Sequence, residues 1–384
     1  MVSVSWGDHL TFGTGDGRLD SSEALRRRMA AWRDELGAGR VHWRVRRTRF
    51  PGHHHAAPGH RHSNLTVARD PGWDDLDVVP AVARDAGLAT DLYVALFDDG
   101  WPLSPETVRK VSYHNAYHAR HVCWQSAFSR DNPDAMTLDR EGNPQWGVPS
   151  LADPYVRAHY RDRFLAFAAG RHVDGIFLCL RSQSRPPEDA DQFGFNQTVL
   201  NDFEAAHGHP LDERDADDRH RWHVLMGGYL TTFVPELRAA LIEKGLRLSI
   251  GIPRGDVLGP PLGNAIIDWR HWVTEGLVDE LVINQNSSRC PSTWLDLWPM
   301  HRGGGYRQDY TTGRGMQSLA DQIAEVYAPV LATSATRLVV ARQWEDRDQV
   351  AEANFMAEAG IDGLIFSSIR HDNPDAVKRN EWAA

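Results

Sequence analysis

The stretch Val173-Asp174-Gly175-Ile176-Phe177-Leu178-Cys179-Leu180 joins a turn to a short apolar run, a combination typical of a buried parallel strand. The Asp-Gly pair predicts the end of a helix and the turn into the strand. Ile361-Asp362-Gly363-Leu364-Ile365 repeats this arrangement. Because both aspartates precede their strands, we expect them at the N-terminal face of the sheet, where a structural role is expected.

Apolar runs of this kind recur along the chain, separated mostly by amphipathic stretches of helical length, which is typical of parallel strands covered by helices. The predicted strands are Val2–Trp6, Val41–Val45, Thr90–Phe97, Gly175–Leu180, Arg247–Ile252, Glu280–Asn284, Arg337–Ala341 and Gly363–Phe366. The predicted helices are Ser22–Leu36, Pro154–Ala169, Tyr229–Lys244, Ser318–Ala332 and Asp348–Glu358. Such a series of βα repeats favours a closed barrel over an open doubly wound sheet. No low-complexity linker divides the chain, so we predict an α/β fold in which residues 1–384 form a single (β/α)8 TIM barrel domain with long βα loops.

Composition excludes several classes of protein. The 42 basic and 52 acidic residues give a formal net charge of −10 without long like-charge runs, which argues against nucleic-acid or membrane partners. The first residues lack a basic and then apolar leader, so a cytoplasmic location is expected. Cys123, Cys179 and Cys290 show no CxxC spacing, which predicts neither a disulfide framework nor a thiolate zinc site.

Two regions are long for βα loops and rich in aromatic residues, namely those between Gly100 and Asp153 and between Ser287 and Gln317. Long loops at the C-terminal face of a barrel usually shape a binding site. Trp124, in the first of them, is therefore a candidate for substrate binding.

The region around the fourth strand carries a resemblance to a known family. Three parts of the chain resemble glycosyl hydrolase-like barrels related to family ten. They are residues 173–185 with Phe193-Gly194-Phe195-Asn196, the approach to this strand at residues 139–157, and Asp268-Trp269-Arg270-His271-Trp272. The resemblance spans roughly residues 139–285 and implies a carbohydrate-active enzyme. Relatives commonly place an aspartate where this chain has Cys179, so a carboxylate role there cannot be carried over. We expect Cys179 to be a small buried residue.

Glycoside hydrolysis requires two carboxyl groups. The candidates are Glu345 after the seventh predicted strand, Asp256 after the fifth and Asp8 after the first. Each has a structural alternative, because Glu345 could be a helix-start acid and the two aspartates could form turns beside glycine. The pair Asp98-Asp99 before a glycine is interpreted as a simple turn.

Other polar and aromatic residues at the predicted strand ends are candidates for substrate binding. They are Arg44, Arg46, Arg181, Gln183, Arg254, Gln285, Asn286, Arg342, Gln343 and Trp344. Arginine suits carboxylate, sulfate or phosphate groups, so this set indicates an anionic group on the substrate, which the resemblance implies is a saccharide. In the alternative, each arginine pairs with a carboxylate at the rim and the network is neutral.

The residues His53, His54, His55, His60 and His62 share a Pro/Gly-bounded loop after the second predicted strand. Their spacing matches no strong metal motif, so we expect no metal and no cofactor. The leading hypothesis is a glycoside hydrolase. A lyase or metal-assisted hydrolase that uses the loop histidines, and a non-catalytic sugar-binding barrel, remain as alternatives.

Overall fold

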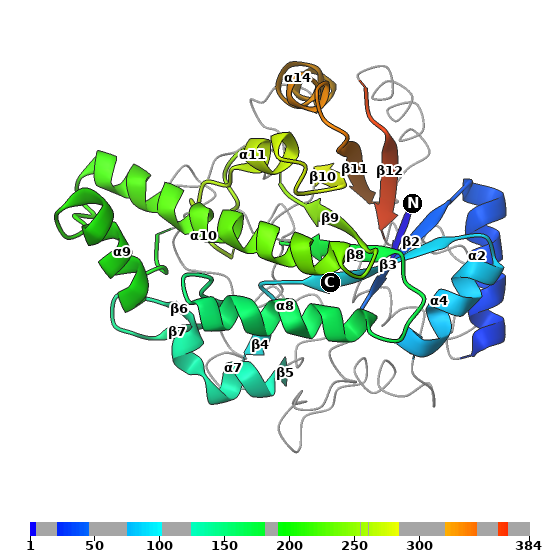
Figure 1. Cartoon of the computed structure of the whole chain (residues 1–384), viewed down its shortest axis with the longest axis horizontal. Coiled ribbons are helices and arrows are strands. Elements are labelled where there is room, and N and C mark those ends of the chain that lie inside the picture. Colours follow the sequence, from blue (N-terminus) through cyan, green and yellow to red (C-terminus); the bar gives the residue numbers. More distant parts are fainter. Residues whose placement is uncertain are drawn as a thin grey trace, which may run out of the picture.

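The computed structural model describes residues 1–4, 21–45, 75–101, 124–180, 191–253, 255–259, 261–283, 319–343 and 360–367. Within them, eight parallel strands close a barrel in the order β1-β12-β11-β10-β9-β8-β3-β2 (Figure 1). These strands are β1 (Val2–Val4), β2 (Arg40–Arg44), β3 (Ala89–Ala95), β8 (Gly175–Cys179), β9 (Arg247–Gly251), β10 (Glu280–Ile283), β11 (Arg337–Gln343) and β12 (Gly363–Ser367). All eight predicted strands are confirmed, with bounds that differ by at most two residues.

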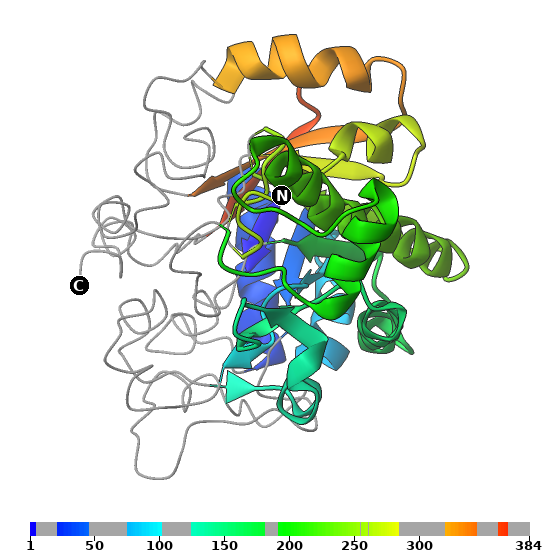
Figure 2. The same ribbon diagram turned by 90° about the vertical axis from the view of Figure 1, so that its left-hand side faces the viewer.

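Helices cover the outside of this barrel. They are α2 (Ser22–Leu36), α4 (Asp75–Asp85), α8 (Pro154–Ala168), α9 (Gln197–His207), α10 (Ala216–Ile242), α11 (Trp269–Thr274), α13 (Leu319–Gln322) and α14 (Ala328–Leu331). A π-helical segment, Ile323–Tyr327, joins the last two. Together these three segments form the helix drawn in orange in Figure 2, which lies on one side of the barrel beside α11. Among the described residues, none of the helices combines the length and the hydropathy of a transmembrane span.

Two predicted helices differ from the structure. The helix predicted at Tyr229–Lys244 begins much earlier, at Ala216, where the Asp215 side chain accepts the N–H groups of Asp217 and Asp218. Its first turns are polar, and tertiary packing of Trp222 and Met226 holds them in place. The helix predicted at Asp348–Glu358 lies outside the described residues.

Small antiparallel hairpins follow β3. β4 (Gly100–Trp101) pairs with β5 (Trp124–Gln125), and β6 (Met136–Leu138) pairs with β7 (Pro144–Pro149). The short helix α7 (Ala127–Asp131) and a 3-10 turn, Pro133–Ala135, lie between the two hairpins in the chain. The long loop predicted after the third strand therefore contains regular structure.

Apolar side chains fill the barrel interior. They come from five strands and form a cluster separate from the larger core between strands and helices: Tyr93, Phe177, Cys179, Val282, Val339 and Ile365. Cys179 is buried, and the Tyr93 hydroxyl donates a hydrogen bond of 3.3 Å to its Sγ. The expectation that Cys179 is a small buried residue is confirmed.

Aspartates that immediately precede three of the strands share one hydrogen-bonding pattern. Each carboxylate accepts a backbone N–H from the neighbouring strand, at 2.7 Å: Asp174 from Thr90, Asp279 from Leu248 and Asp362 from Leu338. The structural role predicted for Asp174 and Asp362 is confirmed. Asp279 lacks the Asp-Gly signal in the sequence, because Glu280 replaces the glycine that follows the other two.

Candidate functional site

The C-terminal ends of the strands carry the predicted site, and the structure describes part of it. The side chains of Arg44 and Asp256 are described, whereas Trp124, Arg342 and Gln343 are placed only as positions in β5 and β11. The remaining candidates lie outside the described residues: Asp8, Arg46, Arg181, Gln183, Arg254, Gln285, Asn286, Trp344 and Glu345. The histidine loop at residues 53–62 lies outside them as well.

Arg44 ends β2 and is buried. Its Nη2 lies 2.7 Å from Asp98 Oδ2, and its guanidinium carbon lies 4.6 Å from the centre of the Tyr93 ring. Both partners of this ion pair are at most 6% exposed. At this arginine, the structure shows the neutral pair that the sequence allowed as the alternative to an anion-binding group.

Asp98 and Asp99 are more than the simple turn inferred from the sequence, because both are buried at the C-terminal end of β3. Asp99 Oδ1 accepts from Arg163 at 2.8 Å, and its Oδ2 accepts from the hydroxyls of Tyr160 and Ser126. Burial and the Asp99 charge raise the pKa of Tyr160 well above its ordinary value, so this tyrosine is a donor. Asp99 therefore anchors the β4–β5 region to α8.

Asp256 follows β9 and is held at one oxygen. Its Oδ1 accepts from Trp269 Nε1 at 2.8 Å and from Arg270 Nη1 at 2.7 Å. No described residue donates a hydrogen bond to Oδ2, and the side chain is 31% exposed. The carboxylate thus has a fixed orientation, and its Oδ2 receives no hydrogen bond from the described residues, which the turn interpretation alone does not predict.

A second polar group joins three segments that follow β8 and β9. Asp191 Oδ1 lies 2.9 Å from His223 Nε2 on α10 and accepts from Asn264 Nδ2 at 3.0 Å. Burial alone would raise the pKa of Asp191, but its contacts with His223 and Asn264 and the charge of Arg219 lower it. No local sequence pattern predicts this group, which connects the loops after two neighbouring strands to α10.

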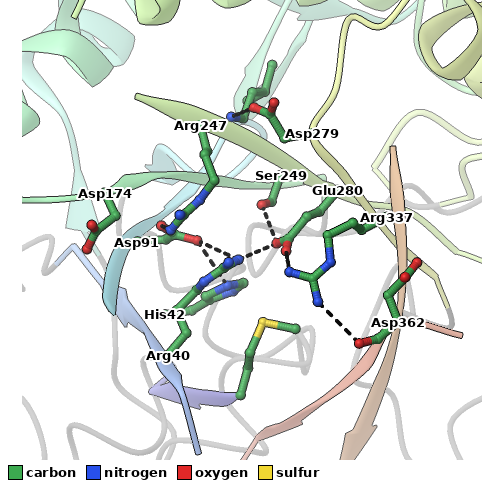
Figure 3. A network of polar contacts seen from close by, with 12 residues as sticks. Arg40, His42, Asp91, Asp174, Arg247, Ser249, Asp279, Glu280, Arg337 and Asp362 are labelled. Carbon is green, nitrogen blue, oxygen red and sulfur yellow. Dashed lines mark hydrogen bonds and ion pairs between the residues drawn. The ribbon is translucent and has the colours of Figure 1, made fainter. Parts of the chain in front are cut away.

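A buried polar cluster lies at the opposite, N-terminal ends of the strands (Figure 3). Ligand-type atoms of His42, Asp91 and Glu280 lie within 4.8 Å of one another. Arg40 Nη1 lies 2.5 Å from Glu280 Oε2 and 3.3 Å from Asp91 Oδ2, so a guanidinium already bridges the two carboxylates. Arg247 pairs with Asp91, at 3.0 Å.

Arg337 adds a further cation, 3.3 Å from Glu280 Oε1. The three arginines together outnumber the two carboxylates of the cluster, and added cationic charge would be repelled. A divalent metal therefore does not fit these residues. The sequence signal was present, because His42, Asp91, Ser249 and Glu280 are polar residues within apolar strands.

We expect the stability of the fold to depend on pH through His42. Burial lowers the pKa of His42 below its ordinary 6.5, against the opposite effect of Asp91. At this position the unfolded chain therefore binds a proton more readily than the folded chain. The contribution of neutral His42 to the free energy of unfolding is complete above pH 6.5 and is lost as the pH falls. We expect a loss of up to about 1.4 kcal/mol for each pH unit, and we expect His42→Gln to remove that slope.

Denaturant unfolding between pH 7.5 and 4.5 would measure this effect. Burial opposes ionisation of Asp91, but its contacts with His42 and the charges of Arg40 and Arg247 outweigh burial and lower the pKa of Asp91 below 3.8. The stability that ionised Asp91 contributes is therefore lost only at a pH more acidic than this range. His220→Gln, at an exposed position of α10, controls for the loss of one histidine. Parallel curves for the native chain and His42→Gln would contradict the prediction.

Comparison with known proteins gives only remote likenesses. No family model matches the chain, and neither does any curated protein. Among solved structures, a GH36 α-galactosidase from Geobacillus stearothermophilus in complex with raffinose is 11% identical, with a TM-score of 0.43 over 94% of this chain and 39% of that one. A noncanonic maltogenic α-amylase from Thermotoga neapolitana is 9% identical, with a TM-score of 0.42 over 90% of this chain and 62% of that one.

An α-galactosidase from Lactobacillus brevis is 11% identical, with a TM-score of 0.40 over 93% of this chain and 37% of that one. The chain thus spans less than two thirds of the length of each of these three proteins. The barrel itself is established by the strand order given above, which requires no relative.

Proposed function

We propose that this chain is a carbohydrate-active enzyme, a glycoside hydrolase whose carboxylates lie at the C-terminal ends of the barrel strands. The geometry of Asp256 carries the proposal. One of its oxygens is fixed by an indole and a guanidinium, and the other receives no hydrogen bond from the described residues. A carboxylate that attacks a sugar, or activates water, needs this fixed orientation and an open oxygen.

The second carboxyl group in this proposal is Glu345, which follows β11. β9 and β11 are separated by β10 alone, so their ends lie roughly 10 Å apart at the usual spacing of neighbouring strands. Side chains that converge from two such strands can reach the separation of about 5 to 9.5 Å that glycosidases use. Asp8 follows β1, four strands from β9, and suits the opposite side of the mouth.

The charge of the sugar is a separate part of the proposal. Arg44 is paired with Asp98, and Arg270 with Asp256. An anionic substituent would therefore contact other predicted arginines, namely Arg46, Arg181, Arg254 or Arg342. The sequence resemblance to barrels related to family ten supports a saccharide substrate without selecting one.

A panel of 4-nitrophenyl glycosides tests the proposal. It should contain α- and β-glucosides, α- and β-galactosides and a β-glucuronide. We expect the chain to release nitrophenol from at least one of them and to keep this activity after exhaustive chelation. Activity lost on chelation would favour the metal-assisted alternative. A lyase would leave the nitrophenyl glycosides intact and would eliminate the 4-O-linked sugar of a uronic acid oligosaccharide to give an unsaturated uronate. Saturable sugar binding without turnover would indicate a non-catalytic barrel.

A further inference from the structure

The helix that precedes β11 contains an irregularity. Between α13 and α14, the N–H of Ala328 donates to the carbonyl of Ile323, five residues earlier, as in a π-helix. Such segments are rare and occur frequently at functional sites, because the extra residue redirects the side chains around it. The last residue of this segment, Tyr327, is wholly buried.

Tyr327 reaches the turn that bears Asp256. Its hydroxyl accepts the backbone N–H of Gly255 at 2.9 Å. Gly255 has a φ of +82°, in the left-handed region that favours glycine, so the turn has an unusual backbone whose N–H is buried. A buried N–H that loses its acceptor is costly, and the turn would move to regain one.

The same side chain also contacts the indole that holds the Asp256 carboxylate. The rings of Tyr327 and Trp269 lie 4.7 Å apart between centres, with an interplanar angle of 32°. Trp269 is wholly buried and donates its Nε1–H to Asp256 Oδ1 at 2.8 Å. Tyr327 therefore contacts both supports of Asp256, the backbone turn and the indole donor.

We infer that Tyr327 is a positioning residue for the Asp256 carboxylate, and this inference rests on the function proposed above. Tyr327 acts through Gly255 and Trp269 and does not itself touch the substrate. The helix before β11 thereby orients a carboxyl group at the end of β9, while β11 itself leads to Glu345. This link fixes one of the two proposed carboxyl groups relative to the element that carries the other.

Tyr327→Phe tests the inference, because it keeps the ring and removes the acceptor. We expect the Asp256 carboxyl ¹³C resonance and the Trp269 indole N–H resonance to shift, with assignments taken from Asp256→Asn and Trp269→Phe. On the glycoside found in the panel, kcat should fall about 10-fold while KM changes less than about 2-fold, as expected when a reacting group is misplaced. Tyr229→Phe is the matched control, since its hydroxyl bonds Asp202, between α10 and α9.

The spectroscopic and kinetic results separate the two proposals. Unchanged Asp256 and Trp269 resonances in folded Tyr327→Phe would overturn the role of Tyr327, whatever the activity. Shifted resonances in a chain that hydrolyses no glycoside would support the positioning contact and count against the proposed function. If Tyr327→Phe does not fold, amide exchange of Gly255 in the native chain decides: protection supports the hydrogen bond, and rapid exchange refutes it.

Discussion

Gly227→Ala is expected to lower the free energy of unfolding by about 3 kcal/mol or more, at the upper end of the usual cost of overpacking. A Cβ atom at this position of α10 would lie 1.7 Å from the carbonyl oxygen of Ile266 and 2.4 Å from its carbonyl carbon. Both contacts are with backbone, so no change of rotamer removes the overlap. Either the helix or the loop after β9 has to move.

Movement of either the helix or the loop would disrupt backbone hydrogen bonds. The N–H of Ile266 donates to the carbonyl of His223 on α10 at 2.9 Å, and the N–H of Ile267 donates to the carbonyl of Asp256 at 2.8 Å. Ile267 is buried as well. A shift large enough to accept the methyl group would break the first of these bonds and pull on the second, which belongs to the residue that carries the proposed chemistry.

The neighbouring glycine provides the matched control. A Cβ at Gly228 would meet no atom within 4 Å, so Gly228→Ala should leave packing unchanged and raise stability by about 0.5 to 1 kcal/mol through helix propensity. Denaturant unfolding of the two variants beside the native chain measures the difference. Similar stabilities for Gly227→Ala and Gly228→Ala would show that α10 and the loop do not pack as described.

The strands were predictable from sequence for a clear physical reason. Each buried parallel strand must be apolar over several consecutive residues, and this leaves a local pattern such as the run after Asp174. Helix α10 was less predictable, because its first turns are polar and are held by contacts with distant segments. The bond between His223 and Asp191 is one such contact.

The polar pairs were the least predictable part. Arg44 and Asp98 are separated by 54 positions, and Arg40 and Glu280 by 240. Nothing local to either residue reveals its partner, so the sequence could only offer paired and unpaired arginines as alternatives. The contacts that position Asp256 were equally unpredictable from the sequence. Trp269 and Arg270 were noted only for a family resemblance, and Tyr327 lay within a predicted helix.

On a disaccharide substrate, Glu345→Gln and Asp256→Asn should each lower turnover at least about 10²-fold, the scale of losing a positioned acid, base or nucleophile. Both substitutions keep the size of the side chain and remove its charge, so folding should change little. If Glu345 were only a helix-start acid, its loss would cost about 0.3 to 1 kcal/mol of stability and leave turnover intact. Asp348→Asn, at the first residue of the helix predicted at Asp348–Glu358, is the control.

The leaving group separates the roles of the two carboxyl groups. A general acid matters most when the departing oxygen is basic, as in a disaccharide, and least when it departs as nitrophenolate. We expect Glu345→Gln to impair disaccharide hydrolysis far more than nitrophenyl glycoside hydrolysis, and Asp256→Asn to impair both. Since the two groups act as a unit, the double variant should lose less than the product of the single losses. Unchanged turnover in Glu345→Gln on both substrates would exclude that residue and leave Asp8 as the proposed partner of Asp256.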